Sequence, residues 1–473
     1  MSYRPWLSGL VALFAASSLT GAAQAEKRHK EAKPREPLPF ALDAYPSTYS
    51  PLPRVDTLIR NATVLDGLGA RLDDTDVLMA GGKIVSVGRD LAPPDGATVI
   101  DASGHWLTPG VIDVHSHNGT FVAPLTSQDW EASDVTESTD PNTSHTSVLH
   151  AVNVQDPAFS RALAGGVTTL QVLPGSTVLF SGRAAVLKPI PAVTAQAMRF
   201  PGAPAAMKMA CGENPKGHFA ESGRFPASRM GEVAGMREQW LKARKHRNEW
   251  EAYERGDKKD PPDRDLKLET LSAALRGEVR VHLHCYRSDD IATMLSLARE
   301  FGYRIAAVHH ASEAYKIAGL LRDEGVCAAV WPDWWGFKME VGDAIRENAA
   351  FLDAAGACVM MHSDSPQVGQ RLNIEAAKAM GAGRRAGLDI RPEQAVRWFT
   401  SNPAKALGME DRIGSLAPGR NADVVVWSGD PFSIYTKADQ VFIDGALVYD
   451  RADPGRRPRS DFEVGRPNAS PRP

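Results

Sequence analysis

The stretch Pro109-Gly-Val-Ile-Asp-Val-His-Ser-His-Asn-Gly119 decides the fold and carries the first chemical signal of the chain. Its aliphatic residues, two valines and an isoleucine, are all β-branched, which predicts a short buried strand. His115 and His117 follow at the end of that strand, two residues apart. Side chains at positions i and i+2 leave a strand on the same face, so the two imidazoles converge, as a divalent metal requires. A lone His-x-His pair fits packed or surface histidines equally well.

The composition indicates a globular protein with a sizeable core and no affinity for nucleic acid. The chain has 473 residues, a net charge of -3 and 43% hydrophobic residues. This length allows one large catalytic domain and a smaller one, and the balanced charge gives no basic surface for nucleic acid. We expect a small-molecule substrate as the partner, and the composition leaves a homo-oligomer open.

Four cysteines are present, Cys211, Cys285, Cys327 and Cys358, and none forms a C-x-x-C pair. Their number permits disulfides in an oxidising compartment, but their spacing does not assign a pairing. We expect buried free thiols.

Residues 1–25 have the pattern of an export signal. Arg4 precedes an apolar run, and Ala23-Gln24-Ala25 supplies a small-residue cleavage site. An uncleaved anchor is the alternative, although the apolar run is short for a membrane span. We expect a periplasmic or secreted protein without stable membrane insertion after signal cleavage.

The flanking regions differ in pattern from the centre. Residues 26–53 are charged and proline-rich, which is typical of a tether or wrapping arm. Short β segments fill 54–105 and return in 407–450, so we expect both ends of the chain to form one small β-sandwich. The Arg- and Pro-rich residues 451–473 are expected to be disordered.

The central residues 106–406 alternate short apolar strands with amphipathic helices. This alternation favours a parallel sheet, and eight βα units close a barrel. The charged stretch 232–267 accounts for the extra length, as an inserted helical excursion with a solvated face. The predicted fold class is therefore α/β, a distorted (β/α)8 TIM barrel with a β-sandwich made from both chain ends.

Residues able to bind a metal recur at the ends of the predicted strands. His284 and His310 are 26 residues apart, close to one βα unit, and Asp364 follows after 54 more. Active sites of such barrels lie at the carboxyl ends of the strands. The spacing places six candidate metal ligands on strands 1, 4, 5, 6 and 8: His115, His117, Glu213, His284, His310 and Asp364.

Several histidines compete with these candidates. His282 shares a strand face with His284, and we assign it to the barrel core because His284 is nearer the strand end. His309 and His310 are expected to point to opposite faces, so that only one enters the barrel. His362 precedes the aspartate by two residues and is assigned to a supporting or packing role.

At strand 4 two residues remain open as ligands. Lys208 could be carboxylated and bridge two metals, whereas Glu213 binds a metal directly. We favour Glu213 because a carboxylate needs no modification.

The combined motifs resemble the amidohydrolase superfamily, and within it the imidazolonepropionase-like secreted hydrolases. The resemblance covers nearly all of residues 55–450. It rests on Pro109 to His117, Gly166-Val-Thr-Thr169, Leu173-Pro-Gly-Ser176, Met207 to Pro215, His284-Cys-Tyr-Arg287, His310 to Tyr315, Asp333-Trp-Trp-Gly336, Ser363-Asp-Ser-Pro366, Asn402-Pro-Ala-Lys405 and Gly414 to Gly419.

The resemblance implies a distorted barrel, a flanking β-sandwich and one or two divalent metals, with zinc as the candidate. It implies that His115, His117, His284, His310 and Asp364 serve the site. Glu213 is similar to the strand-4 glutamate of the N-acetylglucosamine-6-phosphate deacetylase branch, but lies in a Gly-Glu-Asn setting instead of Pro-Glu-Asn. That departure leaves the number of metals open.

The expected activity is hydrolysis of an amide, cyclic-amide or peptide C–N bond by a metal-activated hydroxide. Asp364 is the expected general base, and His310 helps to stabilise the oxyanion. Tyr286, Arg287, Trp334 and Trp335 are the expected substrate-binding residues. A deaminase or deacetylase on the same scaffold and a non-catalytic periplasmic ligand-binding protein are the alternatives.

Overall fold

The computed structural model describes residues 38–41, 45–121, 123 and 126–456. The predicted export signal, most of the predicted tether and the predicted disordered tail beyond residue 456 lie outside these residues. Of the predicted arm, Phe40 is fully buried and Tyr49 donates a 2.5 Å hydrogen bond to Asp444. The described part of the arm therefore packs on the folded protein.

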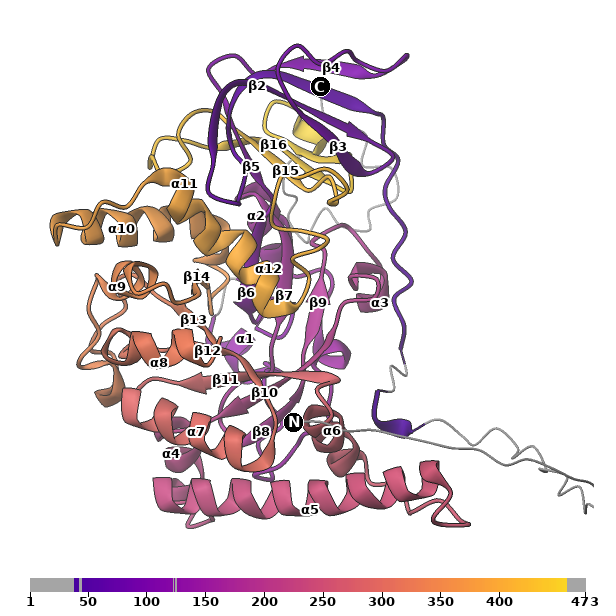
Figure 1. Cartoon of the computed structure of the whole chain (residues 1–473), viewed down its shortest axis with the longest axis vertical. Helices are drawn as coiled ribbons and strands as arrows, with labels where there is room; N and C mark the ends of the chain where they lie inside the picture. The colour runs from indigo at the N-terminus through magenta and orange to yellow at the C-terminus, as the bar shows by residue number, and fades with distance from the viewer. Residues whose placement is uncertain (1–37, 42–44, 122, 124–125, 457–473) are drawn as a thin grey trace, which may run out of the picture. The chain divides into compact units, whose positions relative to one another are not determined.

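Strands from both ends of the chain form one eight-stranded sheet (Figure 1). The link between the two ends is the antiparallel pairing of β5 with β15, in which Trp106 faces Trp427. The hydrogen bonds give a single sheet, so a second facing layer, and with it the sandwich, stays a prediction. The strands are β1 (Thr57–Leu65), β2 (Arg71–Ala80), β3 (Lys83–Gly88), β4 (Thr98–Asp101), β5 (Trp106–Pro109), β15 (Val424–Trp427), β16 (Ala438–Ile443) and β17 (Ala446–Asp450).

The central region contains nine strands in two further sheets. β10 to β14 pair in parallel and in sequence order, with β8 antiparallel at the edge of β10. β6 pairs in parallel with β7, which pairs antiparallel with β9. The strands are β6 (Val111–Ser116), β7 (Val167–Val172), β8 (Phe180–Arg183), β9 (Ala185–Leu187), β10 (Ala205–Ala210), β11 (Val279–Cys285), β12 (Ile305–His310), β13 (Cys327–Val330) and β14 (Val359–Met361).

Hydrogen bonds join the ends of the first and last of these strands. The backbone N–H of Asp364, just after β14, donates to the carbonyl of His115 in β6 at 2.9 Å. The side chains that follow β14 therefore face those of β6. The strand pairing is consistent with a parallel α/β core, and closure into a complete barrel stays a prediction.

Helices cover the outside of the parallel strands, where α7, α8 and α9 pack beside β12, β13 and β14 (Figure 1). No helix in the described ranges combines the length and apolar character that a membrane span needs. The helices are α1 (Ser127–Glu131), α2 (Pro157–Ala164), α3 (Ala195–Met198), α4 (Glu213–Glu221), α5 (Arg229–Arg255), α6 (Leu266–Leu275), α7 (Ser288–Phe301), α8 (Ala318–Asp323), α9 (Asn348–Ala354), α10 (Leu372–Arg385), α11 (Pro392–Ala395) and α12 (Ser401–Leu407).

The charged stretch 232–267 is mostly the long helix α5, as expected, but only its outer face is solvated. Ser228 caps its start by accepting a hydrogen bond from Gly231, and Gly256 ends it at φ = +97°. The inner face buries Trp240, which stacks on Tyr303 with ring centroids 4.3 Å apart. α5 is therefore an amphipathic covering helix of the core.

The expectation of free thiols is wrong, because all four cysteines are paired. Cys211 is bonded to Cys285, and Cys327 to Cys358, with Cα atoms 5.4 and 4.5 Å apart. Each bond joins neighbouring parallel strands or the residue next to a strand, so partners 74 and 31 residues apart in sequence become adjacent in space. Sequence spacing cannot show this proximity, because it depends on strand order.

Candidate metal centre

Five strands bring their polar side chains to one edge of the core. The strand register determines which of these side chains lie at the same level along the strands. Lys208 pairs with His282 and Ala210 with His284. His284 in turn pairs with His309. The residues delivered to this edge are His115 and His117 from β6, Lys208 from β10, His282 and His284 from β11, His309 and His310 from β12, and His362 and Asp364 after β14.

Two imidazole nitrogens and one carboxylate oxygen face one another at the centre of this group. The Nε2 atoms of His115 and His117 lie 3.3 Å apart, and Asp364 Oδ1 lies 3.2 and 3.0 Å from them. The Nδ1 atom of His117 lies 2.8 Å from the carbonyl oxygen of Leu173, which can only accept. In the neutral ring the hydrogen is therefore on Nδ1, and Nε2 presents a lone pair. A cation between these atoms would satisfy them.

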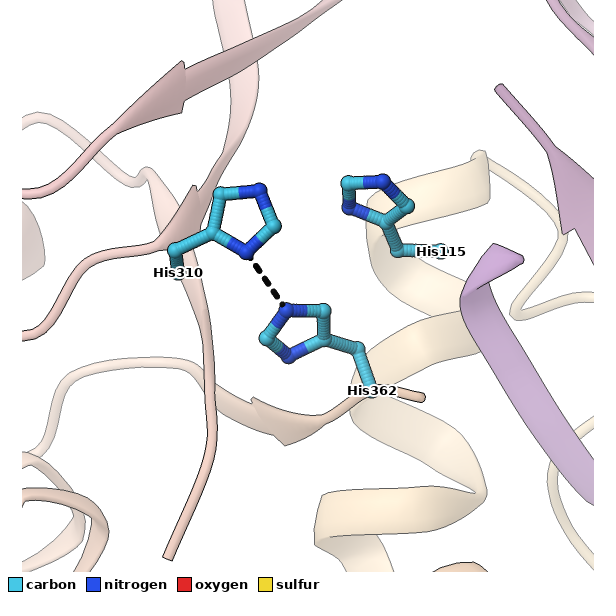
Figure 2. Close-up of side chains that lie close together, drawn as sticks. All are labelled: His115, His310 and His362. Carbon is cyan, nitrogen blue, oxygen red and sulfur yellow. Dashed lines mark hydrogen bonds between the residues drawn. The ribbon is translucent and has the colours of Figure 1, made fainter. Parts of the chain in front are cut away.

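A second group shares His115 with the first. His115, His310 and His362 offer nitrogen atoms that lie within 4.8 Å of one another (Figure 2). His310 Nδ1 is 3.0 Å from His362 Nε2, the contact drawn as a dashed line in Figure 2. The structure thus brings His362, which the sequence placed in a supporting role, into direct contact with a candidate ligand.

The surroundings of His284 give the clearest evidence on whether these residues suit a metal. Its ring is buried 4.5 Å from that of His310, and within the described ranges neither of its nitrogens has a hydrogen-bond partner. A buried imidazole without partners is unfavourable, because burial removes the water that would satisfy it. A metal bound at this position would remove that cost, so the donor set fits a divalent cation.

The backbone is unusual at two of these residues. His310 has φ = +72° and Asp364 has φ = +53°, both in the left-handed region that residues other than glycine seldom adopt. Such conformations persist where surrounding structure enforces them, and they concentrate at functional sites. Ser363, the neighbour of Asp364, is held by a 2.5 Å hydrogen bond that it donates to Asp113. Asp113 also accepts a hydrogen bond from the backbone N–H of His115.

The left-handed turn at His310 also overturns one expectation. His309 and His310 were expected to point to opposite faces of the strand. Instead both rings contact His115, at centroid distances of 4.8 and 4.9 Å. Strict alternation applies only to extended backbone, and it ends where β12 ends.

Burial and mutual charge determine the protonation of the group. Burial opposes ionisation of Asp364, but electrostatic attraction to His310 and the contact with His117 outweigh it, so the pKa of Asp364 falls below its usual range. Burial, together with the charge on Lys208, lowers the pKa of His115. These shifts favour an ionised carboxylate at Asp364 and a neutral imidazole at His115, the forms that bind metals.

At strand 4 the structure places Lys208, and not Glu213, beside the histidines. Lys208 Nζ lies 3.4 Å from His115 Nε2, and burial lowers its pKa to about 8. Glu213 lies in the first turn of α4, where its carboxylate is 3.8 Å from Lys338 Nζ.

The expected substrate-binding residues do not all face the site. Tyr286 is buried, with its ring stacked 5.2 Å from His310, and Trp334 stacks on Trp331, which covers His310 in turn. A cavity of about 360 Å³ is lined by His310, Trp331, Trp334 and the largely exposed Trp335.

Arg287 turns away from this cavity. It forms an ion pair with Asp289 at 2.6 Å, and 41% of its side chain is exposed. It lies at the start of α7, where the local pairing with an acidic residue of the first turn determines its direction.

A cation that the sequence reasoning missed lies nearer to the centre. Lys338 Nζ is 4.5 Å from the ring centroid of Tyr286 and donates a 2.6 Å hydrogen bond to Asn214. Burial lowers its pKa despite the nearby carboxylates of Glu213 and Glu340. No sequence motif marks Lys338, and only its position after the Asp333-Trp-Trp-Gly336 motif could have suggested it.

Comparisons with known proteins agree with this geometry. Residues 106–449 match the amidohydrolase family. This chain belongs to that family. Amidohydrolase tasK of Hapsidospora irregularis is 31% identical over 441 residues, which are 83% of this chain and 43% of that protein. The chain thus spans less than half the length of this curated relative.

Other relatives are covered more completely. The imidazolonepropionase of Deinococcus radiodurans is 26% identical over 372 residues, 76% of this chain and 86% of that protein. Among solved structures, an amidohydrolase from Thermotoga maritima MSB8 has 36% identity and a TM-score of 0.77, and the match covers 84% of this chain and 100% of that chain. The similarity to amidohydrolases and imidazolonepropionase, expected from the sequence, is confirmed.

Proposed function

We propose that this protein is a metal-dependent hydrolase of amide, cyclic-amide or peptide C–N bonds, built on a distorted (β/α)8 barrel. The observation that carries the proposal is the convergence of His115 Nε2, His117 Nε2 and Asp364 Oδ1 within 3.3 Å, with His117 Nδ1 directed at the Leu173 carbonyl oxygen. Two imidazole nitrogens and a carboxylate oxygen in contact form a ligand set that suits a divalent cation. Membership of the amidohydrolase family gives that cation a catalytic role.

The residues that would hold zinc or a similar divalent cation are His115, His117, His284, His310 and Asp364, with Lys208 at strand 4. A bound divalent cation supplies an acidified water and polarises the carbonyl of the substrate. Lys208 is preferred to Glu213 because its amine is already beside His115. Its lowered pKa makes the neutral amine, the form that reacts with carbon dioxide, accessible near pH 8.

The chain's own residues then move the proton. Asp364 is ionised at neutral pH and accepts the proton of the attacking water, which it passes to the leaving nitrogen. The His115 carbonyl fixes the backbone of Asp364 through a 2.9 Å hydrogen bond, so that its carboxylate points into the group. The indoles of Trp331 and Trp334 form an apolar wall beside His310.

Lys338 gives the site a preference for substrates with an anionic group. Its ammonium lies above Tyr286, whose ring contacts both His284 and His310. A carboxylate on the substrate would replace Asn214 as its partner. We therefore favour N-acyl amino acids, dipeptides and acidic cyclic amides over neutral substrates.

Deamination is the second candidate function, because an adenine deaminase of Shouchella clausii is 23% identical over 428 residues. Attack at a ring carbon with loss of ammonia would use the same residues. Release of ammonia distinguishes this reaction from opening of an amide.

The two disulfides support export to an oxidising compartment, since such bonds persist in secreted and periplasmic proteins. We propose a periplasmic or secreted location, in agreement with the signal pattern of residues 1–25.

The test is a substrate screen on the purified protein, loaded with Zn²⁺ or Co²⁺. The panel contains N-acyl amino acids, dipeptides, imidazolones and adenine, with Asp364→Asn as the matched inactive control. Turnover that requires both the metal and Asp364 supports the proposal. Metal-independent turnover, or none in the presence of bound metal across the C–N panel, would reject it.

A further inference from the structure

Three buried side chains extend from His115 into the core, away from the candidate metal. His115 Nδ1 lies 3.1 Å from His309 Nδ1, and His309 Nε2 lies 2.9 Å from His282 Nδ1. His282 Nε2 then lies 3.5 Å from the side-chain amide of Gln171. His282, His309 and Gln171 are each fully buried, so water cannot replace any partner in this chain of contacts.

Each contact between two rings in this series needs a hydrogen between the two ring nitrogens. A neutral imidazole carries one hydrogen, on either Nδ1 or Nε2. The position of the hydrogen on one ring therefore determines its position on the next. This series of hydrogen bonds can run in two self-consistent directions, from His115 towards Gln171 or the reverse, and the metal site at His115 decides between them.

We infer that His309, His282 and Gln171 are positioning residues that hold His115 in the tautomer with its hydrogen on Nδ1, which leaves Nε2 free to bind a metal. In this direction His115 donates to His309, His309 donates from Nε2 to His282, and His282 donates from Nε2 to Gln171. The inference rests on the proposed function, because only a metal at Nε2 requires that tautomer.

As placed, the Gln171 amide nitrogen faces His282 and fits the reverse direction, whereas exchanging its oxygen and nitrogen fits the inferred direction. Its Oε1 atom is buried and finds no partner among the described residues, whereas its Nε2 faces His282. Oxygen and nitrogen of such an amide are assigned from the hydrogen-bond network. Turning the amide by 180° gives the orphaned oxygen a donor, the His282 Nε2–H, and makes the whole chain consistent.

The reverse direction would place a hydrogen on His115 Nε2. That nitrogen lies 3.4 Å from Lys208 Nζ, a donor, and 3.2 Å from Asp364 Oδ1, an acceptor. A hydrogen there could be donated to Asp364, but it would block binding of a metal at Nε2. The reverse direction therefore fits only the metal-free site, and metal binding selects the tautomer with its hydrogen on Nδ1.

The experiment compares His309→Asn with His309→Leu, two side chains of nearly equal shape. Asparagine offers an oxygen close to the position of Nδ1 and can accept from His115, whereas leucine cannot. Apo protein is titrated with Zn²⁺ against a chromophoric chelator, and circular dichroism confirms folding. We expect His309→Leu to weaken zinc binding about 10–100-fold, and His309→Asn to stay within a few-fold of the unmodified protein.

If both variants bind zinc as tightly as the unmodified protein, the inference is overturned. An equal loss of zinc affinity in both variants would also overturn it, because such a loss would indicate a packing effect alone. If His309→Leu does not fold, long-range ¹H–¹⁵N NMR of histidine-labelled, zinc-loaded protein decides. The expected hydrogens are on Nδ1 of His115 and Nε2 of His309 and His282, and a hydrogen on Nδ1 of His309 would overturn it. Absence of zinc binding in the unmodified protein would instead reject the proposed function.

Discussion

Asp364 has the most demanding position of any residue in the site. It is ionised, its backbone is left-handed, and its carboxylate contacts two imidazoles at 3.0 and 3.2 Å. We expect Asp364→Asn to lower kcat by about 10²–10⁴-fold, because an amide cannot accept the proton. Bound zinc should be largely retained, since the histidines and Lys208 remain. Steady-state kinetics with elemental analysis measures both, and Asp343→Asn, at an exposed ion pair, is the control. Unchanged turnover would remove Asp364 from this role.

Lys338 and Arg287 allow a matched comparison of two cations. Lys338→Met should raise KM for a carboxylate-bearing substrate and lower kcat/KM about 10–100-fold, which corresponds to loss of one charged hydrogen bond. Arg287→Met should leave both constants unchanged, because its guanidinium pairs with Asp289 at the surface. Kinetics on one N-acyl amino acid tests both variants. Equal effects would show that the preference for anions has another source.

Sequence periodicity predicted the ligand-bearing strands but not how they end. The residues at 115, 117, 284, 310 and 364 were predicted from their place near strand ends, and the structure brings these strand ends together. The convergence of both His309 and His310 on His115 depends on a left-handed turn at His310 that no pattern of hydrophobic residues indicates. Lys208 was ranked below Glu213 because a carboxylate binds a metal without modification, and the sequence does not show that α4 begins at Glu213.

At the level of elements, α5 places a carboxyl group in an unfavourable position. Glu232, in its first turn, is buried and accepts a hydrogen bond from the Gly212 N–H at 3.0 Å. Burial raises its pKa from 4.5 to about 7. Because the folded-state pKa exceeds the unfolded one, ionisation destabilises the fold. The stability that protonated Glu232 contributes to the folded state is fully present below about pH 4.5 and is lost as the pH rises through 7.

Glu232→Gln removes this pH dependence and keeps an oxygen for the Gly212 N–H. We expect the stability of the variant relative to the unmodified protein to rise by about 3 kcal/mol between pH 4.5 and 8. Chemical denaturation at both pH values measures the difference. The exposed Glu238→Gln, on the same helix, serves as control. A constant difference would show that Glu232 is ionised at little cost.

The disulfides fix pairs of neighbouring strands. The bond Cys327–Cys358 joins β13 to the residue before β14 and closes a separation of 31 residues. Replacing both cysteines by serine should lower the free energy of unfolding by about 3 to 4 kcal/mol, mainly by freeing the unfolded chain. Thiol titration under denaturing, non-reducing conditions should find no free thiol in the unmodified protein. Four titratable thiols would contradict the pairing.

For the whole molecule, the strands and their shared sheet were easier to predict than the contacts between elements that are distant in sequence. The short β segments predicted in 54–105 and 407–450 are present, and the strands of both chain ends share a sheet. Such features follow from local alternation and from turn residues. The disulfides and the inner face of α5 were missed because they depend on which elements become neighbours, which periodicity does not encode.

Metal binding should also stabilise the whole protein, because the ligands come from strands that separate on unfolding. Zinc in excess over its dissociation constant by 100-fold stabilises the folded state by about 2.7 kcal/mol. We therefore expect a chelator to lower Tm by several degrees, and zinc to restore it. Differential scanning calorimetry before and after dialysis provides the measurement. A Tm that does not respond to chelation of a metal-loaded sample would contradict this coupling.

The most direct test of the central claim is the metal content of the purified, folded protein after dialysis against Zn²⁺, measured by elemental analysis. The claim is that β6, β10, β11, β12 and the end of β14 build one cation site, and it predicts one or two equivalents of metal per chain. In a variant with alanine at both His115 and His117 the content should fall sharply. A folded protein that takes up no metal, or a variant that retains all of it, would contradict the account.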